Sequence, residues 1–143
     1  MREFRVSADN ASSIQLCWNP VISSVLAICT ESGGLNLYSF KDQGIEFHNI
    51  DPSLKAKCCC WSPKGKQIVA GFMNGKLMQF NMELKPARTI ECPPTIFQGG
   101  SFDVIAVQWL STYQFAIAFL SHQEASRPGN FIIVQFYFIF YLA

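Results

Sequence analysis

The sequence lacks an excess of charge of either sign. Its 143 residues carry 11 Lys and Arg against 10 Asp and Glu. Phosphate affinity needs clustered cations that release several counterions on binding. We therefore expect no direct contact with nucleic acid, and we interpret the densest group of cations as solubilising charges at a turn. That group is spread over twelve positions and consists of Lys55, Lys57, Lys64 and Lys66.

The sequence also lacks an apolar run long enough to cross a membrane. The longest such run covers residues 131–143, whereas a membrane-spanning helix needs roughly 20 residues. The run is rich in aromatic and β-branched residues, which favour strands. A buried strand is therefore preferred here over a membrane anchor, and we expect no membrane insertion.

The six cysteines and two histidines lack the spacing of a metal site or a disulfide framework. No Cys-x-x-Cys motif occurs, and His48 and His122 are far apart in the sequence. Residues 58–60 are all Cys, and neighbours on a strand point to opposite faces, so the three thiols cannot converge on one metal or pair with one another. Because no signal peptide is recognisable, we interpret the cysteines as small buried side chains in a reducing compartment. The others are Cys17, Cys29 and Cys92.

No nucleophile, base and carboxylate occur at a spacing that indicates a catalytic site. His48 could act as a general base, but it has no such partner nearby and falls on an expected outer strand, so we interpret it as a surface residue. Gly99-Gly100 lacks the strand, following helix and Lys of a phosphate-binding loop and is interpreted as a flexible joint. We predict no catalytic, cofactor-binding, metal-binding or small-molecule site, and therefore no enzyme.

What the chain does contain is an internal repeat. Three segments align around Trp18, Trp61 and Trp109, and these tryptophans lie 43 and 48 residues apart. A spacing of about 40 to 45 residues is typical of four-stranded β-propeller blades. Each tryptophan is flanked by apolar residues, so we expect it to pack between blades rather than to stack on a base or a peptide.

The same order of strands and turns follows each tryptophan. Residues 62–65, Ser-Pro-Lys-Gly, fit a β-turn. Gly33-Gly34 and Asn74-Gly75 tolerate the positive φ of a tight hairpin. Fourth strands are expected at 45–48 and 88–91, where the sequence is more polar, as suits an exposed outermost strand. No 3.6-residue apolar period persists, so helices should be scarce.

The third unit is less regular than the first two. A longer connection around Arg127-Pro128-Gly129 precedes a third strand expected at 131–136. We predict an all-β fold, a partial β-propeller of about three four-stranded antiparallel blades that form a single incomplete domain. The blades are expected at about residues 10–50, 51–95 and 100–136, with an atypical end at 137–143.

The middle repeat resembles a WD40-type blade, although the Gly-His and Trp-Asp dipeptides of that family are absent. More narrowly, the region from Ile14 to Phe136 resembles the N-terminal propeller of the large FG nucleoporin of the cytoplasmic pore face, the family also called CAN. The likeness is strongest from Cys60 to Phe119. The strings that carry it are Cys60–Gly71, Asn74-Gly75, Phe80, Ile90-Glu-Cys-Pro-Pro94, Val104–Trp109 and Thr112–Ile117.

The resemblance implies part of a seven-bladed propeller at the cytoplasmic face of the nuclear pore complex. It also implies protein partners, namely a DEAD-box RNA helicase of mRNA export and other nucleoporins. It assigns no partner-binding residue in this chain, and the chain holds no Phe-Gly repeat for transport receptors. A generic WD40-type adaptor is the alternative, and an enzyme on the propeller channel is a third hypothesis. Because an incomplete ring leaves apolar faces open, we expect the chain alone to be poorly soluble.

Overall fold

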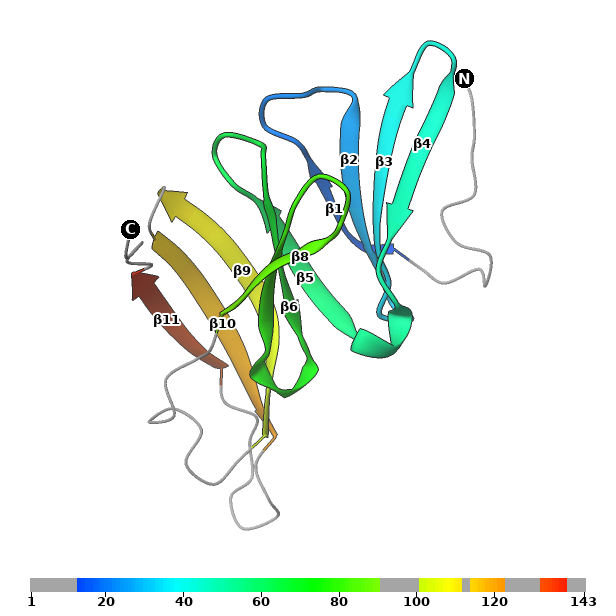
Figure 1. Ribbon diagram of the computed structural model, residues 1–143. Coiled ribbons are helices and arrows are strands. Elements are labelled where there is room, and N and C mark those ends of the chain that lie inside the picture. The colour runs from blue at the N-terminus through cyan, green and yellow to red at the C-terminus, as the bar shows by residue number, and fades with distance from the viewer. Residues whose placement is uncertain (1–12, 91–100, 112–113, 123–131, 139–143) are drawn as a thin grey trace.

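The computed structural model describes residues 13–90, 101–111, 114–122 and 132–138, and this part of the chain forms three antiparallel sheets in chain order (Figure 1). Two short 3-10 turns connect strands, and none of the helices in the described ranges is long and apolar enough to cross a membrane. The strands and turns are β1 (Ser13–Trp18), β2 (Val25–Thr30), β3 (Leu35–Lys41), β4 (Gly44–Asn49), η1 (Pro52–Leu54), β5 (Ala56–Trp61), β6 (Ile68–Phe72), η2 (Met73–Gly75), β7 (Leu77–Phe80), β8 (Pro86–Ile90), β9 (Ser101–Ser111), β10 (Gln114–His122) and β11 (Ile132–Phe138).

The all-β prediction is confirmed, and each sheet pairs strands that are neighbours in sequence. The first two sheets have the orders β1-β2-β3-β4 and β5-β6-β7-β8, and the third, within the residues described, has the order β11-β10-β9. The strand expected at 131–136 is present as β11 and runs two residues further. The predicted joint at Gly99-Gly100, the connection at 127–129, Cys92 and residues 139–143 lie outside the described residues.

Local turn chemistry sets the hairpins where the sequence places them. The backbone N–H of Gly65 donates to the carbonyl of Ser62 at 2.8 Å, which closes the predicted β-turn. Asn74 and Gly75 have φ of 63° and 72°, the positive values expected of a tight hairpin. In the Gly33-Gly34 pair it is Gly33 that takes the positive φ, 95°.

The sheets stack with their first strands adjacent and their last strands outermost, as blades do (Figure 1). Strand β5 contacts both β1 and β9. Every residue of β4 is exposed except His48, and every residue of β8 is exposed except Ile90. The predicted polar outer strands are therefore confirmed.

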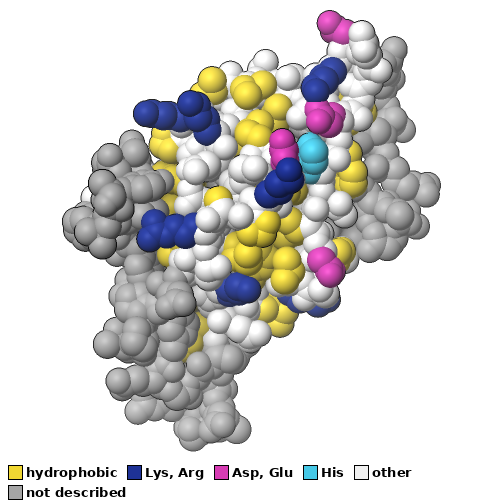
Figure 2. Space-filling view, viewed as in Figure 1, with side chains coloured by type: hydrophobic (Ala, Val, Ile, Leu, Met, Phe, Trp, Pro, Cys, Tyr) yellow, Lys and Arg dark blue, Asp and Glu magenta, His cyan; other side chains and the backbone are white. Residues whose placement is uncertain are grey.

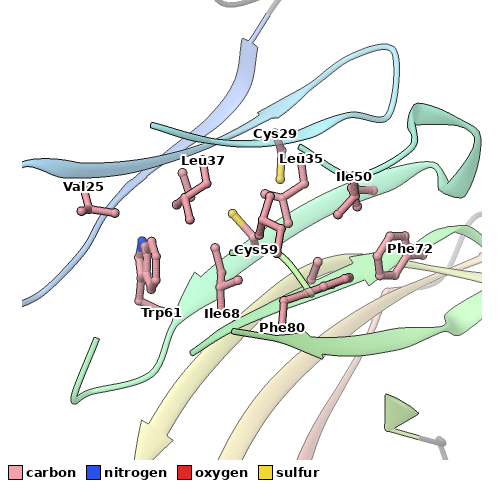
Figure 3. Close-up of a cluster of buried hydrophobic side chains, with 14 residues drawn as sticks. Val25, Cys29, Leu35, Leu37, Ile50, Cys59, Trp61, Ile68, Phe72 and Phe80 are labelled. Atoms are coloured by element: carbon pink, nitrogen blue, oxygen red, sulfur yellow. The ribbon is translucent and has the colours of Figure 1, made fainter. Parts of the chain in front are cut away.

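At each interface an aromatic side chain of one sheet packs against the sheet before it. At the first interface, Trp61, Ile68 and Phe72 of the second sheet lie in one buried cluster with Val25, Leu35 and Leu37 of the first (Figure 3). The indole N–H of Trp61 donates to the carbonyl of Cys17 at 2.9 Å.

The second interface repeats this arrangement between the second and third sheets. Trp109 and Phe115 of the third sheet pack in one cluster with Cys60 and Val69 of the second, and the two aromatic rings meet edge to face at 4.4 Å. The predicted packing between blades is thus confirmed for Trp61 and Trp109.

The same prediction is wrong for Trp18, which is 57% exposed. Trp61 points toward the first sheet, and Trp18, at the equivalent position, points away from the second sheet, beside Ile14 and Leu16. Its ring lies 6.2 Å from that of Phe40. Sequence position fixes which way the tryptophan points, but burial also needs a sheet on that side.

Candidate protein-binding surface

The turns at one end of the sheets are tied together by a buried asparagine. The amide nitrogen of Asn19 donates to the carbonyl of Gly65 at 2.8 Å, 46 residues away in sequence. Its side-chain oxygen accepts hydrogen bonds from the backbone N–H groups of Val21 and Ile22, each at 2.9 Å. We call the three turns at this end, residues 19–24, 62–67 and 81–85, the Asn19 rim. The network holds the first two turns at fixed positions relative to one another.

The Asn19 rim exposes a small apolar group with charged residues around it. Val21 and Ile22 are 65% and 43% exposed, and Lys64 and Lys66 are exposed on the neighbouring turn. Hydrophobic side chains lie beside lysines and arginines in Figure 2. An apolar centre with a polar border is the usual anatomy of a protein-binding patch, and loops on a rigid scaffold commonly carry binding.

The third turn of the rim adds a local ion pair. The ammonium group of Lys85 lies 2.6 Å from a carboxylate oxygen of Glu83, and this contact lowers the pKa of Glu83 and raises the pKa of Lys85. Both side chains are exposed, so the pair contributes little to stability. It leaves one charge of each sign on the rim.

His48 lies on β4, the predicted outer strand, within a second charged group. Its Nε2 is 3.5 Å from Glu46, and Glu46 also forms a close ion pair with Lys41, which holds the pKa of Glu46 below its usual range. His48 is half-buried, whereas Glu46 and Lys41 are exposed. The contact with Glu46 accounts for the position of His48 on the outer strand.

The structure separates the three consecutive cysteines, as predicted. Cys59 faces the first sheet, whereas Cys58 and Cys60 face the third. Burial raises the pKa of Cys60 to about 12 and raises the pKa of Cys58 as well. Such thiols are inert at neutral pH, as structural cysteines are.

Sequence reasoning missed a second cysteine grouping at the first interface. Cys17 donates from its Sγ to the carbonyl of Cys59 at 3.4 Å, and the sulfurs of Cys29 and Cys59 face one another in Figure 3. A hydrogen bond with the Cys59 thiol lowers the pKa of Cys17. In the described ranges, no group of three or more His, Cys, Asp or Glu side chains is arranged to hold a metal ion.

The four lysines of the suspected basic group do not form one patch. Lys55 precedes β5, whereas Lys64 and Lys66 follow it, and a six-residue strand is about 20 Å long. Lys57 lies on β5 and borders a cleft of about 410 Å³ lined by β1, β5, β9 and β10, together with Gln15, Gln108 and several apolar side chains. Among the described residues, the cleft lining contains no acid–base pair.

The family described as NUP159/214 beta propeller matches residues 2–139. Nuclear pore complex protein Nup214 of Drosophila melanogaster is 47% identical over 126 residues, which cover 87% of this chain and 7% of that protein. Nup214 of Homo sapiens is 31% identical over 106 residues, which cover 74% of this chain and 5% of that protein. The chain therefore spans less than a tenth of the length of these relatives.

Solved structures share the fold at low sequence identity. A complex of Saccharomyces cerevisiae Dbp5 with Nup159, Gle1, IP6 and ADP matches with a TM-score of 0.63 and 10% identity, over 89% of this chain and 34% of the other. The β-propeller domain of Cps50 (Swd1) from Myceliophteria thermophila matches with a TM-score of 0.60 and 11% identity, over 89% and 46%. These two matches support a propeller-type arrangement of the sheets.

Proposed function

Because the chain belongs to the NUP159/214 β-propeller family, we propose that it is a non-enzymatic docking module of the nuclear pore complex that receives a DEAD-box RNA helicase on the cytoplasmic face during mRNA export. The observation that carries this proposal is the 47% identity to a Nup214 over 87% of the chain. Other nucleoporins are the second class of partner. The likeness to a Nup159-containing complex that also holds Dbp5 supports a docking role through the shared fold.

The Asn19 rim is the surface we assign to docking. Its turns are held in place by the Asn19 hydrogen bonds, and it exposes Val21 and Ile22 beside lysines. A partner that covers the apolar pair would meet a pre-ordered surface, which lowers the entropy lost on binding. Binding of a partner at the Asn19 rim would require no catalytic group of this chain.

Binding of a purified DEAD-box export helicase to the chain, and to the full-length product of the same gene, tests the proposal. We expect saturable binding that differs between ATP and ADP and that weakens at least about tenfold on Val21→Asp, since a buried charge replaces an apolar contact. The control is Leu54→Asp, an apolar position on η1 that is 40% exposed and lies distant from the Asn19 rim. It should leave binding unchanged.

Two outcomes would contradict different parts of this proposal. Failure of the full-length product to associate with the helicase under either nucleotide would overturn the docking role. Binding by the full-length product that Val21→Asp leaves intact would overturn the assignment to the Asn19 rim.

The two other hypotheses receive less support. A generic WD40-type adaptor would not explain a family match over residues 2–139. An enzyme on the channel side would need reactive groups on the innermost strands, where the described cleft presents Lys57, two glutamines and apolar side chains.

A further inference from the structure

Three thiols from three strands meet between the first and second sheets. Cys17 lies on β1, Cys29 on β2 and Cys59 on β5, and we call them the interface thiols. Across β1 and β2, Cys17 pairs with Ala27 and Cys29 pairs with Gln15, so both cysteines of the first sheet lie on the face that packs against Cys59. The group is enclosed by two sheets of this chain and does not depend on what covers either end of the stack.

Cys59 is the central member of the interface thiols. The Sγ of Cys17 donates to the carbonyl of Cys59 at 3.4 Å, and a hydrogen bond also joins the two thiols. The Cys29 thiol contacts Cys59 as well, and these two sulfurs face one another in Figure 3. A disulfide forms only between cysteines that already approach closely, and Cys59 meets this condition with the first sheet.

Two hydrogen bonds hold β1 and β5 together at the Cys17–Cys59 pair. The side-chain oxygen of Gln15 accepts from the backbone N–H of Cys59 at 2.8 Å. The indole N–H of Trp61 donates to the carbonyl of Cys17 at 2.9 Å. Each bond joins one member of the pair to a residue two positions from the other member. The pair is therefore held in register by groups other than the thiols themselves.

The interface thiols differ in access and in ionisation. Cys17 is partly exposed on β1, an edge strand of its sheet, whereas Cys29 and Cys59 are fully buried. The hydrogen bond between the two thiols lowers the pKa of Cys17 and, with the contact to Cys29 and burial, raises the pKa of Cys59. The thiolate is the nucleophile in cysteine oxidation. An oxidant therefore reaches and reacts with Cys17 first.

We propose that Cys17 and Cys59 are a redox pair that hydrogen peroxide converts into a disulfide between the first and second sheets. The Cys17 thiolate attacks one peroxide oxygen, the O–O bond breaks, and the departing hydroxide takes up the proton lost by the Cys17 thiol. Cys17 is then a sulfenic acid. The Cys59 sulfur displaces its hydroxyl group, which leaves as water with the proton of Cys59. The two thiols lose two electrons in total, and the peroxide is reduced to two waters.

The disulfide changes the first interface from a packed contact to a covalent one. It closes a loop between positions 42 residues apart, which restricts the unfolded chain and so favours the folded one. A reducing compartment keeps the pair as two thiols until peroxide is present, and reductants reverse the bond. The inference concerns the stability of the stack and does not rest on the docking role.

Peptide mapping without reduction tests the proposal on the 143-residue chain and on the full-length product of the same gene. Each protein is treated with hydrogen peroxide, free thiols are blocked with N-ethylmaleimide, and the digest is examined by mass spectrometry. We expect one dominant link, from Cys17 to Cys59, that dithiothreitol removes. In urea the same treatment should also link Cys17 to Cys58 and Cys60, because only the fold separates Cys59 from its neighbours.

Variants separate the roles of the two cysteines. Cys17→Ser should abolish the link. Cys59→Ala should leave the sulfenic acid of Cys17 unresolved, so dimedone should label Cys17 in this variant and not in the unmodified chain. The matched control is Cys60→Ala, next to Cys59 but facing the third sheet, and it should form the link normally. Oxidation should raise the urea midpoint of the unmodified chain and of Cys60→Ala and leave that of Cys17→Ser unchanged.

Four results would overturn the proposal. They are the absence of any link after peroxide treatment, a dominant link from Cys17 to another cysteine, a link to Cys59 that survives in Cys17→Ser, and an absence of dimedone label in Cys59→Ala. The first two are measured on the unmodified protein, so they hold even where a variant fails to fold.

Discussion

Two equivalent tryptophans differ by one hydrogen bond. The indole N–H of Trp61 donates to the carbonyl of Cys17, whereas the buried indole N–H of Trp109 has no partner among the described residues. A satisfied buried hydrogen bond contributes about 1 kcal/mol, and an unsatisfied donor is unfavourable. We predict that Trp61→Phe destabilises the chain by about 1 kcal/mol more than Trp109→Phe.

Urea unfolding of the two variants measures this difference directly. Both substitutions remove the same ring volume at equivalent positions, so each serves as the control for the other. Equal losses of unfolding free energy would contradict the prediction.

The cysteines should differ in reactivity according to their surroundings. Cys17 is partly exposed and its pKa is lowered by a hydrogen bond with the Cys59 thiol, whereas burial raises the pKa of Cys60 to about 12. Since the thiolate is the reacting species, a lower pKa gives more of it at a given pH. At a pH of about 7.5, iodoacetamide should label Cys17 at least about tenfold faster than Cys60.

Peptide mapping by mass spectrometry after timed labelling provides the measurement. The same labelling in urea is the control, because unfolding should make the two rates similar. Faster labelling of Cys60 than of Cys17 in the folded chain would show that the described burial is wrong.

At the scale of single residues, the sequence predicts the face to which a side chain points better than it predicts whether that side chain is buried. The repeat places Trp18, Trp61 and Trp109 at one strand position, and strand alternation correctly separates Cys59 from its two neighbours. Burial depends on whether another sheet packs against that face. The alternation of side chains along a strand carries no information about a neighbouring sheet. The exposure of Trp18 and the meeting of Cys17 with Cys59 both follow from stacking between sheets.

At the scale of strands, β6 and β9 meet with no space for an added methyl group. A Cβ placed on Gly71 would lie 2.3 Å from Cγ1 of Val104 and 2.8 Å from Sγ of Cys58. Overpacking of this kind costs typically about 1–3 kcal/mol. We predict that Gly71→Ala destabilises the chain by about 2 kcal/mol, and that Val104→Ala in the same chain recovers part of the loss.

A double-mutant cycle on unfolding free energies measures this coupling. Gly71→Ala and Val104→Ala should be non-additive by about 1 kcal/mol, with the double variant more stable than the sum predicts. Strict additivity would mean that β6 and β9 do not approach one another as described.

Two asparagines on different turns of the Asn19 rim allow the rim to be tested. Asn19 is buried and joins two turns, whereas Asn81 accepts hydrogen bonds from Glu83 and Lys85 within its own exposed turn. Removing Asn19 leaves buried polar groups unpaired, which costs about 1–3 kcal/mol, and water can replace the partner at an exposed turn. We predict a loss of about 2 kcal/mol for Asn19→Ala and under about 1 kcal/mol for Asn81→Ala.

Thermal and urea unfolding of both variants measures the difference. In the functional assay, Asn19→Ala should also weaken helicase binding if the rim is the docking surface, because Val21 and Ile22 lose their fixed position. Equal stability of the two variants would contradict the role given to Asn19.

Strands and hairpins of this fold are predictable because their signals are local. Apolar runs, Ser-Pro-Lys-Gly at 62–65 and Asn74-Gly75 each act within a few residues. The Asn19 rim is not predictable in the same way. Its defining hydrogen bond joins Asn19 to Gly65, 46 residues apart, and only the stacking of two sheets brings these positions together.

At the scale of the molecule, the second sheet is the most protected part of the described chain. It has a sheet on each face, and all five residues of β6 are buried, whereas β4 is almost wholly exposed. Regions with more buried contacts open less often. Hydrogen exchange should therefore be at least about a hundredfold slower in β6 than in β4.

Exchange followed by mass spectrometry over hours gives this comparison, with β8 as a second outer strand that should behave like β4. Exchange in β6 as fast as in the outer strands would mean that the three sheets do not form a stable stack.

Trp61 and Trp109 each pack against the sheet that precedes them in the chain, and this direction sets an order for folding during synthesis on the ribosome. Each sheet pairs strands in chain order, so the first sheet can form before the second is translated. The side of the first sheet that packs against Trp61 is then in place when Trp61 emerges. The second sheet is likewise in place when Trp109 emerges. Each tryptophan therefore arrives after the surface that it covers, and growth of the nascent chain adds one closed interface at a time.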